Sequence, residues 1–275
     1  MSGANEGSLM KLSKYYLIAR NTWDETLVYR LNFVMWRVRV ILGILTMYFL
    51  WLALLPPGQN ILGYTRELML TYILGTSLIN SIVISSRTYE VGDHINSGNL
   101  SNFLIRPINY FGYWFARDLG DKAMNIVFSA SELTILFFIL KPPLFIQSDI
   151  SLIMLTLVSC AFALVLYFII NFLLGSIGFW SPEVWAPRFI FITVLTFFSG
   201  GLFPLDILPK PIFSALSLLP FTYLLFFPLK IYLGQLATYE IIRGILISSV
   251  WIVILSQVLR FVWQRGLRVY TAYGR

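Results

Sequence analysis

The chain has 275 residues, of which 58% are hydrophobic and only 12% are charged, and its mean hydropathy is +0.77. Soluble domains carry about 25% charged residues, so this composition excludes an ordinary soluble protein and predicts an integral membrane protein. The net charge of +7 comes from basic residues scattered between apolar runs, which indicates membrane topology and argues against a nucleic-acid partner.

Residues 11–31, KLSKYYLIARNTWDETLVYRL, predict an amphipathic helix before the first long apolar run. At helical spacing, one face collects Leu12, Tyr16, Ala19, Trp23 and Leu27. This pattern is typical of a helix that lies in the membrane interface. The alternative is a helix in water that packs on the loops.

Six later segments predict membrane spans, because each approaches the roughly 20 mostly apolar residues that a span needs. They cover approximately residues 32–55, 68–86, 123–140, 151–178, 189–203 and 244–261. Residues 87–122 are polar enough to form a loop between the second and third spans. The predicted fold class is an all-α integral membrane protein with six transmembrane helices in a single domain, 1–275.

Proline marks residues 204–239, between the fifth and sixth spans. The uncharged run 211–229 is long enough to cross a membrane, but Pro220 and Pro228 interrupt it, and proline breaks helices. Broken helices at membrane depth persist only where protein or a cavity covers them. We expect two short re-entrant helices here rather than a seventh span.

The basic residues agree with six spans and two cytoplasmic termini. On that topology, the cytoplasmic pieces hold six Lys and Arg up to the start of the first span, Arg37 and Arg39 included, four in 87–122, Arg188, and four after residue 259. The outer pieces hold only Arg66, Lys141, Lys210, Lys230 and Arg243. Such a cytoplasmic excess is what membrane topology requires, and a seventh span would reverse the placement of the C-terminal arginines.

The loop contains a short helical pattern, GNLSNFLIRPIN, at residues 98–109. Asn99 is a good N-cap, the apolar residues Leu100, Phe103 and Leu104 repeat at helical spacing, and Pro107 ends the pattern. A short helix with one apolar face needs a partner to bury that face in water. The partner is either the chain's own loops or another protein.

The sequence carries no motif for chemistry of its own. It contains no G-x-x-x-x-G-K-[ST] loop, no H-E-x-x-H and no G-x-S-x-G. A single cysteine, Cys160, and a single histidine, His94, exclude a disulfide framework and a His-rich metal site. We therefore expect a chain that is not an enzyme and that holds no cofactor or metal.

Two features predict polar contacts within the membrane. Tyr72, Thr76 and Asn80 share one face of the second span, and such a stripe either lines a translocation path or forms hydrogen bonds between helices. Glu132 lies near the middle of the third span, where an acid is a functional candidate by default. It either meets a substrate or accepts hydrogen bonds from a neighbouring span.

The stretch at 98–107 resembles the loop between the second and third spans of type-two ATP-binding-cassette exporter permeases. Members often read G-T-x-E-x-L-L-x-T-P there, and this chain reads GNLSNFLIRP in the same register, with Ser101 at the Glu and Arg106 at the Thr. In that family the loop forms the coupling helix, which docks on a cytoplasmic ATPase. The resemblance implies such a docking role for Asn99, Leu100, Phe103, Leu104, Arg106 and Pro107.

Three further motifs carry the resemblance across the chain: L-x-R-P-I, L-P-F-x-Y-x-x-x-x-P-x-x-I-Y-L-G and the C-terminal R-x-Y-x-A-Y-G-R. The resemblance implies a permease subunit that works with a second permease, identical or related, and with ATPase subunits that hold ATP and Mg. It also implies export across a bacterial cytoplasmic (inner) membrane. The alternative function is an ATP-independent secondary carrier or a membrane scaffold.

Overall fold

The computed structural model describes residues 3–28, 30–60 and 62–271, and every regular element in them is a helix. The longer helices are α1 (Gly3–Val28), α2 (Arg30–Leu54), α3 (Arg66–Val83), α6 (Tyr110–Leu140), α7 (Ile150–Gly175), α8 (Trp185–Phe198) and α11 (Thr238–Val269). The short ones are α4 (Glu90–Asn96), α5 (Leu100–Leu104), α9 (Lys210–Leu216) and α10 (Phe226–Tyr232), with 3₁₀ turns η1 (Ser176–Phe179), η2 (Leu205–Ile207) and η3 (Pro220–Tyr223).

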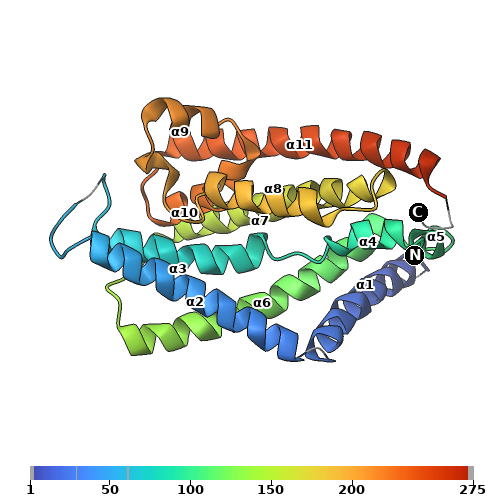
Figure 1. Cartoon of the computed structure of the whole chain (residues 1–275), viewed down its shortest axis with the longest axis horizontal. Helices are drawn as coiled ribbons and strands as arrows, with labels where there is room; N and C mark the ends of the chain where they lie inside the picture. Colours follow the sequence, from blue (N-terminus) through green and yellow to red (C-terminus); the bar gives the residue numbers. More distant parts are fainter. Residues whose placement is uncertain (1–2, 29, 61, 272–275) are drawn as a thin grey trace.

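The longer helices run roughly along the long axis of the molecule (Figure 1). The start of α1, the end of α11 and the short helices α4 and α5 gather at one end of it, and α9 lies toward the other. Polar side chains set several helix starts, because the first backbone N–H groups of a helix lack internal partners. Asn109 accepts from Gly112 N at 2.9 Å at the start of α6, and Asp149 accepts from Ser151 N at 2.8 Å at the start of α7.

Four helices in the described residues are long and apolar enough to cross a membrane, which supports a multi-pass membrane protein. They cover Arg30–Leu54, Tyr110–Leu140, Ile150–Phe179 and Thr238–Val269. The other two predicted spans correspond to α3, with 18 residues, and α8, with 14. At 1.5 Å per residue these two helices reach about 27 and 21 Å, short of a hydrocarbon core of about 30 Å. The count of six spans therefore stays a prediction.

The third long helix begins earlier than its predicted span, at Tyr110 rather than near residue 123. The segment between α3 and α6 in the structure, residues 84–109, is therefore shorter than the predicted loop 87–122. Hydropathy assigned residues 110–122 to a loop because they include Arg117, Asp118 and Lys122. These three side chains are buried in the folded chain, so their charges meet protein partners rather than water.

The N-terminal helix α1 packs on its own chain through threonines and leaves Tyr16 and Trp23, from the face that the sequence pattern places in the membrane interface, exposed. Thr22 and Thr26 are buried against α6 and the α3–α4 connection, while the side chain of Tyr16 is 69% exposed. The exposed large residues are Tyr16, Leu17, Trp23 and Val28, and the side chains of Leu12 and Leu27 lie outside the described residues. A helix that buries threonines and exposes aromatic and aliphatic groups suits a lipid interface on its outer side.

The proline-rich region folds into η2, α9, η3 and α10, and several of its prolines stand at helix starts. Pro211 and Pro220 occupy the first turns of α9 and η3, where the missing N–H costs nothing. Helix α10 lies in the main apolar core, packed on α7 and α3. Its Lys230 is 6% exposed, and its Nζ lies 2.7 Å from Asp206 Oδ2 and 3.0 Å from the hydroxyl of Tyr64.

Candidate functional site

Residues 84–109, which connect α3 to α6, form the candidate site. Two short helices, α4 and α5, lie in this connection at the end of the molecule where α1 starts and α11 ends (Figure 1). An isolated helix of five residues is unstable in water. The position of α5 therefore depends on its contacts with the rest of the chain.

The apolar face of α5 is divided between the chain itself and the surface. Leu100 is fully buried in a cluster with Val91, Ile95 and Trp114. Leu104 is 52% exposed, and beyond the helix Ile105 is 84% exposed. The docking role that the resemblance implies for Leu100 is therefore wrong, because Leu100 anchors α5 from within its own chain and is not available to a partner.

Phe103 belongs to the anchored part of α5. Its ring centroid lies 4.8 Å from that of Tyr113 and 5.5 Å from those of Tyr110 and His94. The guanidinium of Arg106 covers its ring from 5.5 Å. Phe103 is half-buried, so it supports the exposed tip of the loop, which consists of Leu104, Ile105, Arg106 and Pro107.

Asn99 occupies the N-cap position of α5, but its side chain accepts no hydrogen bond from the helix. Its Nδ2 instead donates to Ser97 Oγ at 2.9 Å. The predicted capping bond is therefore wrong. Ser101 N instead has two acceptors at this helix start, Gly98 O at 3.2 Å and the hydroxyl of Tyr270 at 3.1 Å. Tyr270 lies in the C-terminal segment, far from Asn99 in sequence.

Arg87 ties the beginning of the connection to three helices. Its Nε donates to Asp121 of α6 at 3.1 Å, its Nη1 lies 3.3 Å from Glu90 of α4, and its Nη2 donates to Thr26 of α1. Asp121 also accepts from Ser85 Oγ at 2.7 Å. Desolvation by burial opposes the charge of the Arg87 guanidinium, but the carboxylates of Asp121 and Glu90 outweigh it and raise the pKa of Arg87.

Lys122 of α6 holds the end of α3. Its Nζ donates to the carbonyl of Val83 at 2.8 Å and to that of Ser85. Carbonyls at a helix C-terminus lack internal partners and carry partial negative charge, which favours a cation there. Asp118, 3.3 Å from the same Nζ, balances the charge, and both side chains are almost fully buried. The connection to α4 and α5 therefore starts from a point that α6 fixes.

A second arginine links α6 to α4 and α1. Arg117 Nη2 lies 2.5 Å from Glu25 and 3.4 Å from Glu90. Next to this link, the ring centroid of His94 lies 5.0 Å from that of Trp114. Burial lowers the pKa of His94 below its usual value, with a further decrease from Arg117 and opposing effects of Glu90 and Asp93. His94 thus packs in α4 against Trp114 and Phe103, and its burial disfavours the charged form.

The comparison with protein families decides what kind of protein contains this connection. A family model for the ABC-2 family transporter protein matches residues 41–274, which include the whole connection and the proline-rich region. The chain belongs to the ABC-2 transporter family. No matching relative was found among curated proteins. Members of the family are membrane permeases that normally work with an ATP-binding cassette ATPase, and the ATPase is a separate subunit.

The predicted polar stripe of this ABC-2 permease does not form one continuous surface. The hydroxyl of Tyr72 is fully buried and donates to the carbonyl of Gly200 at 2.7 Å. Thr76 is buried too and donates to Ile73 O within its own helix, whereas Asn80 is exposed. Tyr72 therefore bonds to the turn that follows α8, while the hydroxyl of Thr76 bonds within α3. Only Tyr72 makes the kind of contact between segments that the hydrogen-bonding alternative expects.

Glu132 of the permease pairs with Arg37 of α2. Arg37 Nε donates to Glu132 Oε1 at 2.5 Å, and Nη2 donates to Oε2. The two side chains are only 8% and 11% exposed, so this two-pronged pair joins two spans inside the protein. Glu132 also borders an apolar groove between α2 and α6, together with Ile41, Leu45, Phe49, Ile135, Leu136, Ile139 and Leu140.

Sequence reasoning missed the residues that position the connection. Arg87, Arg117 and Lys122 counted only as positive charges of a cytoplasmic loop, and Asp118 and Asp121 carried no assigned role. A spacing signal was present in the permease sequence, because residues 117, 118, 121, 122 and 125 recur at helical intervals. They form one polar face of α6 that the connection and α1 cover.

Proposed function

We propose that this ABC-2 permease has six spans with both termini in the cytoplasm, and that α5 is its coupling helix. In this proposal two cytoplasmic ATPase subunits, which hold ATP and Mg, contact the exposed tip Leu104, Ile105, Arg106 and Pro107. A second permease, identical or related, completes the transporter, and the complex exports its substrate across a bacterial inner membrane.

The observation that carries this proposal is the division of α5. Its inner residues, Leu100 and Phe103, are fixed to their own chain, while Leu104 and Ile105 remain exposed at the tip. Large aliphatic groups at 52% and 84% exposure on a fixed loop are favourable anchors for a protein partner. Arg87 and Lys122 hold the connection that carries this tip. Arg87 contacts α1, α4 and α6, and Lys122 of α6 contacts the end of α3.

This arrangement supports a mechanical role. A push on the tip reaches α6 through Arg87 and Asp121, and it reaches the end of α3 through the carbonyls that Lys122 holds. Because these contacts are buried and charge-assisted, they resist loosening more than single surface contacts do. The ATPase would close on ATP, and the spans would reorient together with the connection.

The test replaces exposed apolar groups of the tip by a charge. Leu104→Asp and Ile105→Asp should leave membrane insertion intact, because both side chains point away from their own chain. Burying such a side chain contributes about 1.5–3 kcal/mol, so affinity for the partner ATPase should fall about 10- to 150-fold. Co-purification with the ATPase and binding titrations of the purified subunits measure the loss.

Leu62→Asp is the matched control. Leu62 is 64% exposed and lies in the connection between α2 and α3, at the opposite end of the molecule. The Leu62→Asp variant should bind the ATPase as tightly as the wild type does. An Ile105→Asp permease that binds the ATPase as tightly as the wild type would contradict the docking proposal.

A further inference from the structure

The C-terminal end of α11 is seated firmly beside α5. Trp263 stacks on Tyr110 with ring centroids 5.3 Å apart and meets Phe172 at 5.4 Å. One turn later, a Cβ on Gly266 would lie 2.1 Å from the ring of Phe179. A side chain here would clash with that ring, so glycine at 266 permits the close packing of α11 on Phe179.

Tyr270 is the first residue after α11, and its hydroxyl contacts α5. That hydroxyl donates to Gly98 O at 2.8 Å and accepts from Ser101 N at 3.1 Å. The Ser101 N–H also lies 3.2 Å from Gly98 O and is therefore shared between two acceptors. One phenol group thus contacts both sides of the first turn of α5, and the Phe179 ring lies against its own ring.

We propose that Tyr270 is a positioning residue that locks α5 to α11, so that α11 follows when α5 is displaced. The inference rests on the proposed function for its transport consequence, but the lock itself is a property of the permease alone. The polar contacts of Arg87 and Lys122 connect the loop to α1, α3, α4 and α6. Tyr270 supplies a separate connection to the last long helix, which runs along much of the long axis of the molecule (Figure 1).

The first experiment tests the lock without any ATPase. Tyr270→Phe keeps the ring and removes both hydrogen bonds of the hydroxyl. A hydrogen bond of this kind contributes modestly on balance, so amide hydrogen exchange in residues 100–104 of the purified permease should become about 2- to 10-fold faster. Tyr239→Phe makes the same chemical change at the other end of α11, where the side chain is 66% exposed, and should leave exchange at α5 unchanged.

Unchanged exchange at α5 in Tyr270→Phe would overturn the lock. Faster exchange throughout the protein, in α3 and α7 as well as in α5, would also overturn it, because the change would then report general destabilisation. Acceleration confined to α5 and the last turn of α11 supports the lock, whether or not an ATPase partner is ever found.

The second experiment tests transmission in the complex with the partner ATPase, trapped with ATP and orthovanadate. In the wild type, trapping should change exchange in both α5 and α11. In Tyr270→Phe the response of α5 should remain, and that of α11 should fall at least twofold. An equal response of α11 in both proteins would overturn transmission through Tyr270. Failure of the wild-type permease to bind the ATPase would refute the proposed function and leave the first result standing.

Discussion

At the scale of single residues, the permease pairs charges that its sequence presents separately. Arg37 counted as a topological signal, and Glu132 as a candidate either for substrate contact or for hydrogen bonds from a neighbouring span. The structure joins them through two hydrogen bonds, and Asn125 Oδ1 accepts a third from Arg37 Nη1 at 3.3 Å. The guanidinium and the carboxylate match in shape. Glu132 therefore faces another helix rather than lipid, and its function in this conformation is to join α2 to α6.

Removing one member of this pair should destabilise the permease strongly. Glu132→Ala leaves the Arg37 guanidinium buried without its carboxylate, which costs about 3–5 kcal/mol in comparable pairs. We expect a lower midpoint of thermal unfolding in detergent. The double variant Arg37→Met/Glu132→Leu should recover most of that stability, because it leaves no buried charge.

Arg39→Met provides the control for this experiment. Arg39 lies on the same helix, but among the described residues it forms no ion pair, and its guanidinium stacks on the ring of Trp36 at 5.0 Å. Its replacement should shift the midpoint much less. If Glu132→Ala unfolds at the wild-type temperature, the pair does not stabilise the contact between the two helices.

At the scale of elements, small residues bring α1 against α6. Gly112, Ala116 and Gly120 recur every four residues on α6, and a Cβ on Gly120 would lie 2.6 Å from the backbone oxygen of Ala19. Small residues at this spacing let two helix backbones approach closely. Trp23 Nε1 then donates to Gly120 O at 2.7 Å. The tertiary contact, rather than the amphipathic pattern alone, decides which face of α1 is buried.

Gly120→Ala should displace α1 although alanine is the better helix former. Overpacking costs about 1–3 kcal/mol, which exceeds the gain in helix propensity of up to about 1 kcal/mol. Limited proteolysis should therefore cleave α1 faster than in the wild type. Gly43→Ala makes the same change on α2, where a Cβ would meet no atom within 4 Å, and should be neutral or stabilising. Equal rates of proteolysis in the two variants would contradict the close approach of α1 and α6 at Gly120.

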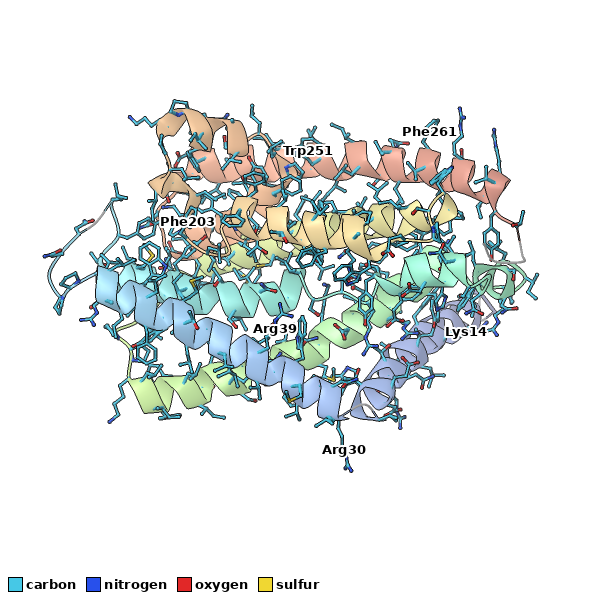
Figure 2. The ribbon with its side chains drawn as sticks, in the orientation of Figure 1. Lys14, Arg30, Arg39, Phe203, Trp251 and Phe261 are labelled. Atoms are coloured by element: carbon cyan, nitrogen blue, oxygen red, sulfur yellow. The ribbon has the colours of Figure 1, made fainter. Side chains whose placement is uncertain are left out.

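At the scale of the whole molecule, the arrangement of the helices agrees with a common side for both termini. The start of α1, the end of α11 and the connection between α3 and α6 lie at the same end (Figure 1). The exposed side chain of Arg30, at the junction of α1 and α2, points away from the bundle (Figure 2). An arginine there suits the headgroup region of a bilayer.

Reporter fusions should place both termini and the connection between α3 and α6 in the cytoplasm. The physical reason is the excess of Lys and Arg in the proposed cytoplasmic pieces. Fusions at Gly98 and at Arg275, which lies outside the described residues, should report a cytoplasmic position, and a fusion at Gly58 should report an outer one. An outer signal at Arg275 would instead require an odd number of spans.

The sequence by itself determined that this is an all-helical membrane protein of the ABC-2 transporter family. The tendency of a segment to enter a bilayer depends on the hydropathy of its own residues. Apolar runs and prolines therefore locate helices without knowledge of their neighbours. Only the tertiary structure decided which side chains meet. Arg37 and Glu132 are 95 residues apart and Tyr270 and Gly98 are 172 apart, and no local pattern encodes such pairs. The burial of Leu100 and the contact of Tyr270 with the start of α5 have the same cause. The helix α5 is too short to be stable alone, so both contacts depend on where α6 and α11 lie beside it.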